Sequence, residues 1–222
     1  MKISLPKGSS ALLPHTQSGR ERVTIGLSWD TPEIMPERPE TFISQLDDSG
    51  NVYEDDIEIS VGFVQETYDL DLVCLIYNRE RVLIDAVSPA PEETVDLSGA
   101  IYHTGDDTEG ISAGDDEQVS VELANLPEDV THLVFLAIIQ SGHTFGQLLN
   151  TACRVADGKT DSDILNFFLA KDGEDGANKT ACALIALSKD EAAQWHIRNI
   201  SEYRVDKDVE DWGTEAASLI RS

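Results

Sequence analysis

The side chains with the clearest chemical potential lie in an acidic stretch, punctuated by glycines, that runs from His103 to Glu117. Its six carboxylates are Asp106, Asp107, Glu109, Asp115, Asp116 and Glu117. Negative charges packed this closely repel one another and raise some of the pKa values unless a cation joins them. Ca²⁺ binds carboxylate and carbonyl oxygens, and glycines let a loop curl around the ion. The stretch therefore predicts a calcium loop; the alternative is a solvated acidic turn, which is common.

The same residue types allow other chemistry. Two carboxylates, one protonated and one ionised, can hydrolyse a glycosidic bond, so a hydrolase is the enzymatic alternative, although nothing in the sequence marks a substrate cleft. His103 offers a nitrogen to a transition metal, but a neutral imidazole that holds the loop by hydrogen bonds is the simpler interpretation. Cys153 with His143 is a weak candidate for a nucleophile pair, and a buried, inert cysteine is favoured.

The charge of the whole chain limits its partners. The formal net charge is −26 and the sequence pI is about 4.2. Nucleic-acid binding needs a basic surface, so we expect none. An anionic membrane surface would be reached only through a bridging Ca²⁺. The N-terminal residues lack the apolar segment of a signal peptide, and no apolar run has membrane-spanning length, so a cytoplasmic protein is expected.

The acids are unevenly distributed along the chain. Between Arg81 and Arg154 there are thirteen Asp and Glu and no Lys or Arg. Ion pairs cannot form inside such a segment, so we expect its carboxylates to be either solvated or bound to a metal.

Apolar patterns predict a mainly β protein. Residues 69–77 alternate, with Leu70, Leu72, Cys74 and Ile76 on one face and Asp69, Asp71, Val73, Leu75 and Tyr77 on the other. The second face begins with two carboxylates and then becomes apolar, which indicates a strand that enters a core from an acidic rim. Further strands are predicted at 2–5, 23–29, 57–63, 81–87, 118–123, 131–139, 151–156, 164–170, 181–187 and 194–200. About ten short strands between turn signals are typical of an antiparallel β-sandwich.

The chain is expected to form one β-sandwich domain over residues 1–205, followed by a helix. An acidic, Pro-bearing segment at about 31–56 reads as a surface insertion with a short helix at 41–46. Residues 206–222 predict an amphipathic helix, because Val209, Trp212, Ala216, Leu219 and Ile220 fall roughly on one helical face.

Several motifs, in order along the chain, resemble the TerD-type tellurite-resistance and stress-response proteins. They are residues 3–8, 23–30, Asp69-Leu70-Asp71, His103-Thr104-Gly105-Asp106, 114–117, Leu126-Pro127, Phe145-Gly146-Gln147 with Asn150, and 195–198. The two acidic motifs together are the most specific of these. The resemblance covers nearly the whole chain except the insertion and the final helix.

This resemblance implies a sandwich similar to calcium-dependent C2 domains, with one or two Ca²⁺ ions held between the Asp-x-Asp strand and the acidic loop. The ligands expected on this basis are Asp69, Asp71, Asp106, Asp115, Asp116 and Glu117, with backbone groups near His103 and Gly105, and this chain adds Asp107 and Glu109 as candidates of its own. The chain also departs from the family pattern. Thr67, Ile111 and Ala113 stand where the family usually has acids, whereas Asp107 and Glu109 stand where it more often has Asn and Thr.

The function expected from the resemblance is that of a non-enzymatic, calcium-binding module in a bacterial stress response. Calcium would order the acidic loops, and these would present a surface to other proteins, including those of the same response. A calcium-bridged membrane-surface module is the second hypothesis, although exposed apolar or basic loop tips are missing. A carboxylate-pair hydrolase is the third.

Overall fold

The computed structural model describes residues 2–14, 21–31, 68–108, 110, 114–169, 176–205 and 209–220. All of them belong to one compact unit formed by Met1–Pro32 and Thr67–Ser222. The predicted helix at 41–46, the predicted strand at 57–63 and almost all of the predicted insertion lie outside the described residues.

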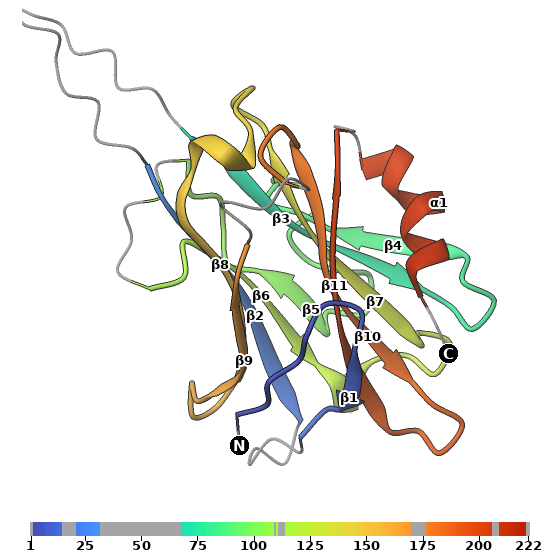
Figure 1. Cartoon of the computed structure of the whole chain (residues 1–222). Helices are drawn as coiled ribbons and strands as arrows, with labels where there is room; N and C mark the ends of the chain where they lie inside the picture. Colours follow the sequence, from blue (N-terminus) through green and yellow to red (C-terminus); the bar gives the residue numbers. More distant parts are fainter. Residues whose placement is uncertain are drawn as a thin grey trace, which may run out of the picture. The chain divides into compact units, whose positions relative to one another are not determined.

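Two antiparallel sheets form the fold, as the sequence predicted (Figure 1). The six-stranded sheet has the order β1-β11-β10-β7-β3-β4, and the five-stranded sheet has the order β5-β6-β2-β8-β9. The strands are β1 (Ser10–Leu12), β2 (Arg22–Asp30), β3 (Leu70–Tyr77), β4 (Leu83–Val87), β5 (Ile101–His103), β6 (Glu117–Glu122), β7 (His132–Ile139), β8 (Leu149–Asp157), β9 (Asp163–Phe168), β10 (Ala181–Lys189) and β11 (Trp195–Arg204). Short 3-10 turns η1 (Leu123–Asn125) and η2 (Phe145–Gln147) and the helix α1 (Val209–Leu219) complete the described elements.

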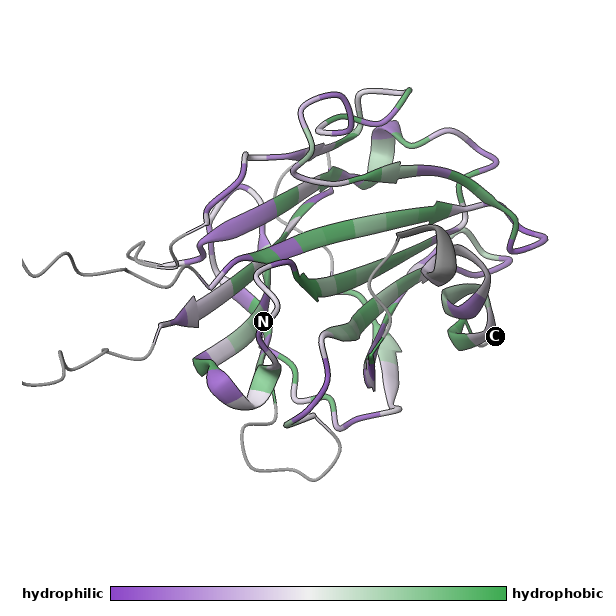
Figure 2. Ribbon diagram, turned by 90° about the horizontal axis from the view of Figure 1, so that it is seen from above, coloured by the Kyte–Doolittle hydropathy of each residue, from purple (hydrophilic) through white to green (hydrophobic). Residues whose placement is uncertain are grey.

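The two faces of β3 alternate as predicted, and they contribute to two separate hydrophobic clusters. Leu70, Leu72, Cys74 and Ile76 are buried in the main core, which also contains inward side chains of the five-stranded sheet. Val73, Leu75 and Tyr77 lie on the other face, where Trp212, Ala216 and Ile220 of the C-terminal segment cover them. The Tyr77 hydroxyl donates a hydrogen bond to the Gly213 carbonyl at 3.0 Å. In Figure 2 the middle parts of the long strands are coloured as hydrophobic, whereas hydrophilic colour gathers in the loops.

The predicted strand at 2–5 is wrong. These residues form no ladder; the Ile3 N–H donates to the Ile164 carbonyl at 2.7 Å. Pro6 has no N–H and cannot continue such pairing. The first strand is β1, further along the chain, and Ser10 pairs with Arg198 of β11.

The pair β3–β7 has two ends with different surroundings. Leu70 lies opposite Ile139 at one end, and Tyr77 lies opposite His132 at the other. The two aspartates of the Asp-x-Asp motif therefore lie at the first end. No helix in the described part of the chain is long and apolar enough to cross a membrane.

Candidate metal centre

Three carboxylates from two sheets converge at the start of β3. Asp69 precedes β3, Asp71 is its second residue, and Asp106 follows β5 in the loop that leads to β6. Each offers one oxygen, and these oxygens all lie within 4.8 Å of one another. The Asp-x-Asp strand and the acidic loop are far apart in the sequence. The sandwich brings Asp69 and Asp71 of the strand close to Asp106 of the loop.

The charges in this group are poorly compensated. Burial, together with the charges of Asp71, Asp106 and Asp107, raises the pKa of Asp69 to about 6. Burial also raises the pKa of Asp71 to about 6, although the Gln140 side chain donates to Asp71 at 2.6 Å and lowers it in part. The buried Oδ1 of Asp69 has no hydrogen-bond partner among the described residues. A buried anionic oxygen without a donor favours a bound cation or a proton.

Glu117 lies beneath this group and ties three elements together. Its side chain is fully buried; Oε2 accepts from the Leu72 N–H at 2.5 Å, and Oε1 accepts from the Asp107 N–H at 3.4 Å. Burial raises the pKa of the Glu117 carboxyl, and hydrogen bonds from His103 and Leu72 oppose that shift. Glu117 thus fixes the loop against β3.

His103 orients the same carboxylate. Its Nδ1 accepts a hydrogen bond from the Gly105 N–H at 3.1 Å, and its Nε2 lies 3.3 Å from Glu117 Oε2. A neutral imidazole that accepts at Nδ1 carries its proton on Nε2, which then points at Glu117. Nε2 forms no hydrogen bond of good geometry among the described residues, but its position beside Glu117 and the bond at Nδ1 indicate that His103 holds the loop.

The loop beyond Asp106 is held by close contacts with β2. Asp107 Oδ1 accepts from the Gly110 N–H at 2.9 Å. Gly110 has φ +60°, and a Cβ there would lie 2.2 Å from Nε1 of the Trp29 indole. Only glycine fits both the backbone and the contact. Glu109 lies outside the described residues, as do Thr67, Ile111 and Ala113.

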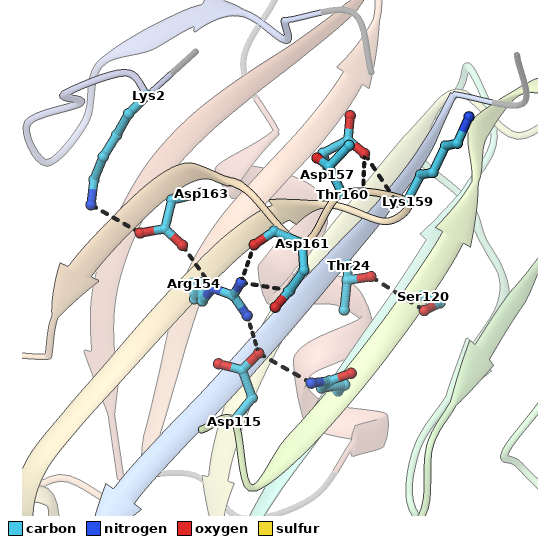
Figure 3. Close-up of polar contacts among 11 residues, drawn as sticks. Lys2, Thr24, Asp115, Ser120, Arg154, Asp157, Lys159, Thr160, Asp161 and Asp163 are labelled. Carbon is cyan, nitrogen blue, oxygen red and sulfur yellow. Dashed lines mark hydrogen bonds and ion pairs between the residues drawn. The ribbon is translucent and has the colours of Figure 1, made fainter. Parts of the chain in front are cut away.

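Asp115 and Asp116 have partners other than this group of carboxylates. Asp116 Oδ2 accepts from the Trp29 N–H at 2.9 Å. Asp115 lies across the outer side of the five-stranded sheet, where its Oδ2 is 2.8 Å from Nη1 of Arg154 (Figure 3). Arg154 points outward because its neighbours Cys153 and Val155 are in the core.

Arg154 connects three carboxylates. Besides Asp115, it contacts Asp161 at 2.6 Å and Asp163 at 2.8 Å, and Lys2 contacts Asp163 at 3.0 Å. The expectation that the acids between Arg81 and Arg154 are either solvated or metal-bound is therefore wrong for Asp115. Its cation comes from just beyond that segment, because pairing of β2 with both β6 and β8 brings the two flanks of the segment together.

Sequence reasoning missed two further residues. Gln140 directly follows the long apolar strand β7 and so lies at the same end of the sheet as Asp69, where it donates to Asp71. Gly26 sits on β2 between Gln118 and Arg154, and a Cβ there would lie 2.2 Å from Cγ of Asp115. A glycine in the middle of an apolar, alternating strand is a signal of such a close approach.

The alternative nucleophile pair finds no support in its geometry. Burial raises the pKa of the Cys153 thiol well above its usual range. His143 stacks on Tyr68 with ring centroids 4.0 Å apart, and its Nδ1 lies 2.9 Å from the Ser141 hydroxyl. All three cysteines are buried and free, as the apolar runs around Cys74 and Cys182 predicted.

The donor set fits a hard divalent cation. Ca²⁺–oxygen distances of about 2.3–2.6 Å place ligands on opposite sides of the ion up to roughly 5 Å apart, which matches a group whose oxygens lie within 4.8 Å. All three donors are carboxylate oxygens, the type that calcium prefers. Asp69, Asp71 and Asp106 would hold the ion, while Glu117 and His103 fix the loop that carries Asp106.

These features define an antiparallel β-sandwich in which three carboxylates, from Asp69, Asp71 and Asp106, converge between the two sheets. The TerD domain model matches residues 1–207, and the chain belongs to this family. It is 28% identical to Tellurium resistance protein TerZ of Serratia marcescens and 26% identical to General stress protein 16U of Bacillus subtilis (strain 168). The first match covers 77% of each chain; the second covers 78% of this chain and 77% of the relative. The fold is similar to the crystal structure of a homologue of telluride resistance protein (TerD) from Streptomyces coelicolor A3(2). That match has a TM-score of 0.62 at 18% identity and covers 88% of this chain and 96% of the other.

Proposed function

We propose that this protein is a non-enzymatic, calcium-binding module of a bacterial stress response. The convergence of Asp69, Asp71 and Asp106 within 4.8 Å carries the proposal. The raised pKa values of Asp69 and Asp71 support it, because burial and the neighbouring carboxylates make the ionised forms unfavourable and a cation would relieve this. The family membership adds relatives named for tellurium resistance and general stress.

A single ion accounts best for the geometry. Three carboxylates share one position, whereas Asp115 is paired with Arg154 and Asp116 caps the Trp29 N–H. Asp107 lies close enough to raise the pKa of Asp69, so it is the next ligand in reach. Backbone carbonyls or water would complete the six to eight oxygens that calcium takes.

Calcium acts here by ordering the loop between β5 and β6. With the ion bound, the repulsion among the carboxylates is removed, and the loop keeps one conformation that a protein partner can recognise. Without it, contacts such as those of Glu117, His103 and Trp29 hold the described part of the loop against the repulsion among its carboxylates. The readout of a stress signal is then the binding of a cytoplasmic partner protein rather than turnover of a substrate.

Calorimetric titration of the full chain with Ca²⁺ tests this proposal. We expect one ion to bind, with affinity lost in Asp69→Asn/Asp71→Asn. Trp29 lies against the loop, so its fluorescence should change with the same midpoint. The matched control is Glu128→Gln/Asp129→Asn, which removes two exposed acids from a turn elsewhere and should bind normally.

Two results would contradict the proposal. One is the absence of calcium binding below millimolar concentration; the other is equal affinity in Asp69→Asn/Asp71→Asn and the parent chain. Flotation with anionic vesicles, with and without Ca²⁺, separates a protein-binding module from a membrane-bridging one. We expect no calcium-dependent flotation.

A further inference from the structure

A surface cavity of about 630 Å³ lies at one end of the strand pair β3–β7. The three carboxylates of Asp69, Asp71 and Asp106 lie at the opposite end. The walls of the cavity come from the start of β7, the end of β10, the first half of β11 and the turns after β3 and β10. We call it the basic cavity, after the side chains Arg79, Arg81, His132, Lys189, His196 and Arg198 that line it.

The composition of this cavity is opposite to that of the chain. Its described lining holds four of the 16 Lys and Arg of the protein but two of the 42 Asp and Glu. One of the two, Asp190, is occupied by its own turn. Its Oδ2 lies 2.9 Å from Nε2 of His196, and its Oδ1 accepts from the backbone N–H groups of Ala192 and Gln194, each at 2.9 Å.

Two of the cations have no carboxylate partner. Arg79 and Lys189 form no ion pair with any acid in the described ranges of the chain, and Lys189 Nζ lies 5.9 Å from the centroid of the Trp195 ring. Arg198 Nη1 donates to the Leu219 carbonyl at the end of α1, at 3.1 Å. In a protein of net charge −26, cations left unpaired beside one cavity are available to an anion.

Hydroxyl groups add neutral donors to these charges. Thr131, which is 5% exposed, lines the cavity, and its Oγ1 has no hydrogen-bond partner among the described residues. The Ser188 hydroxyl lies 3.0 Å from Nδ1 of His132. Burial lowers the pKa of His132, and the charge of Arg81 lowers it further, so the imidazole is neutral and either accepts or donates in this wall.

We propose that the basic cavity binds the phosphate group of a small phosphorylated molecule. Arginine forks and a lysine match the charge and geometry of phosphate oxygens, and serine and threonine hydroxyls supplement them. The volume lies within the range of about 300–1,000 Å³ that small-molecule sites occupy, so it has room for more than the phosphate itself.

The negative charge of the whole chain does not prevent this binding. Ionic screening at physiological salt acts over about 8 Å, so acids beyond the walls contribute little to the potential inside. The nearby cations therefore determine the local field. The position of Arg198, which links the cavity wall to the end of α1, further connects the ligand to the C-terminal helix.

Proton NMR of the full chain in the presence of a chelator tests the proposal. Inorganic phosphate, pyrophosphate and ADP are added separately, and the imidazole signals of the five histidines are followed. We expect His132 and His196 to shift while His103 and His143 stay in place. Phosphate acting alone would identify free phosphate as the source, and tighter binding of ADP than of pyrophosphate would identify a nucleotide.

The variant Arg79→Gln/Lys189→Gln should weaken the binding at least about tenfold. The control Lys159→Gln/Lys179→Gln removes the same charge outside the cavity and should leave the affinity unchanged. If the double variant unfolds, Arg79→Gln alone is used, because that side chain is exposed. The proposal is overturned if none of the three probes shifts His132 and His196, or if Arg79→Gln/Lys189→Gln binds the probes as tightly as the parent chain.

Discussion

Two groups of carboxylates in this sandwich differ in whether the chain supplies them with a basic partner. Around Arg154, the acids Asp115, Asp161 and Asp163 share a guanidinium that the chain itself supplies. At the start of β3, Asp69, Asp71 and Asp106 converge, and no Lys or Arg of the described residues pairs with them. The chain therefore neutralises much of the charge of the first group, whereas the second group has no basic partner among the described residues.

The pKa values follow this difference. Hydrogen bonds from Arg154 and Lys2 lower the pKa of Asp163, whereas burial and neighbouring acids raise the pKa of Asp69 to about 6. At Asp115 the effect of burial exceeds that of the ion pair, because its pKa is raised although Arg154 lowers it in part. The acids of the stretch from His103 to Glu117 thus do not form one site. Asp115 pairs with Arg154, whereas Asp106 joins Asp69 and Asp71.

The largest effect is expected from removal of the shared cation. Arg154→Met leaves Asp115, which is 6% exposed at its side chain, without a charged partner. Breaking such a buried pair costs about 3–5 kcal/mol, and we expect a value near 3 because Asp161 can turn to solvent. Urea unfolding at pH 7 measures it. The exposed control Lys159→Met should change the free energy of unfolding little, and an equal loss in both would remove the distinction between the two groups.

A smaller effect is expected at the glycine beneath Asp115. A Cβ on Gly26 would lie 2.2 Å from Cγ of Asp115, so Gly26→Ala pushes this carboxylate away from Arg154. We expect a loss of about 1–3 kcal/mol in the free energy of unfolding. The loss should not add to that of Arg154→Met, because both changes break the same ion pair. Full additivity in the double-mutant cycle would show that Gly26 acts independently of the pair.

The sequence predicted the part of the candidate site that depends on local pattern. The alternation of residues 69–77 placed Asp69 and Asp71 at a strand end, and the resemblance connected them with Asp106. What it did not predict depends on strand pairing between distant segments. Arg154 reaches Asp115 across β2, Gln140 reaches Asp71 from the end of β7, and Glu117 turns inward under the loop. In each case the sequence gives the residue type but not its neighbour.

Isosteric amides should have opposite effects in the two groups. In the calcium-free protein at pH 8, Asp71→Asn removes a repelled charge and keeps an acceptor for Gln140, so stability should rise by about 1 kcal/mol after allowance for solvent screening. Asp163→Asn removes a carboxylate whose pKa is lowered by hydrogen bonds from Arg154 and Lys2, so stability should fall by about 0.5–1 kcal/mol. Thermal unfolding with a chelator compares the two. The same sign for both substitutions would mean that the groups do not differ.

The smallest effect is the pH dependence of stability in the presence of a chelator. The folded-state pKa values of Asp69 and Asp71 are about 6, above the unfolded value near 3.8. The folded chain therefore binds more protons between pH 4 and 6, and stability from this group falls as the pH rises through 6. Asp163, with its lowered pKa, acts in the other direction, since its contribution is present above pH 4 and is lost on further acidification.

Denaturant titrations at pH 5 and pH 8 measure the contribution of Asp69 and Asp71 to the free energy of unfolding. We expect the parent chain to lose about 1 kcal/mol between these values, because partly exposed carboxylates are screened by solvent. Asp69→Asn/Asp71→Asn should lose less, and saturating Ca²⁺ should stabilise the parent chain more at pH 8 than at pH 5. If the parent and the double variant have parallel profiles, the charge at the start of β3 is already neutralised within the chain, and the contrast with the Arg154 group disappears.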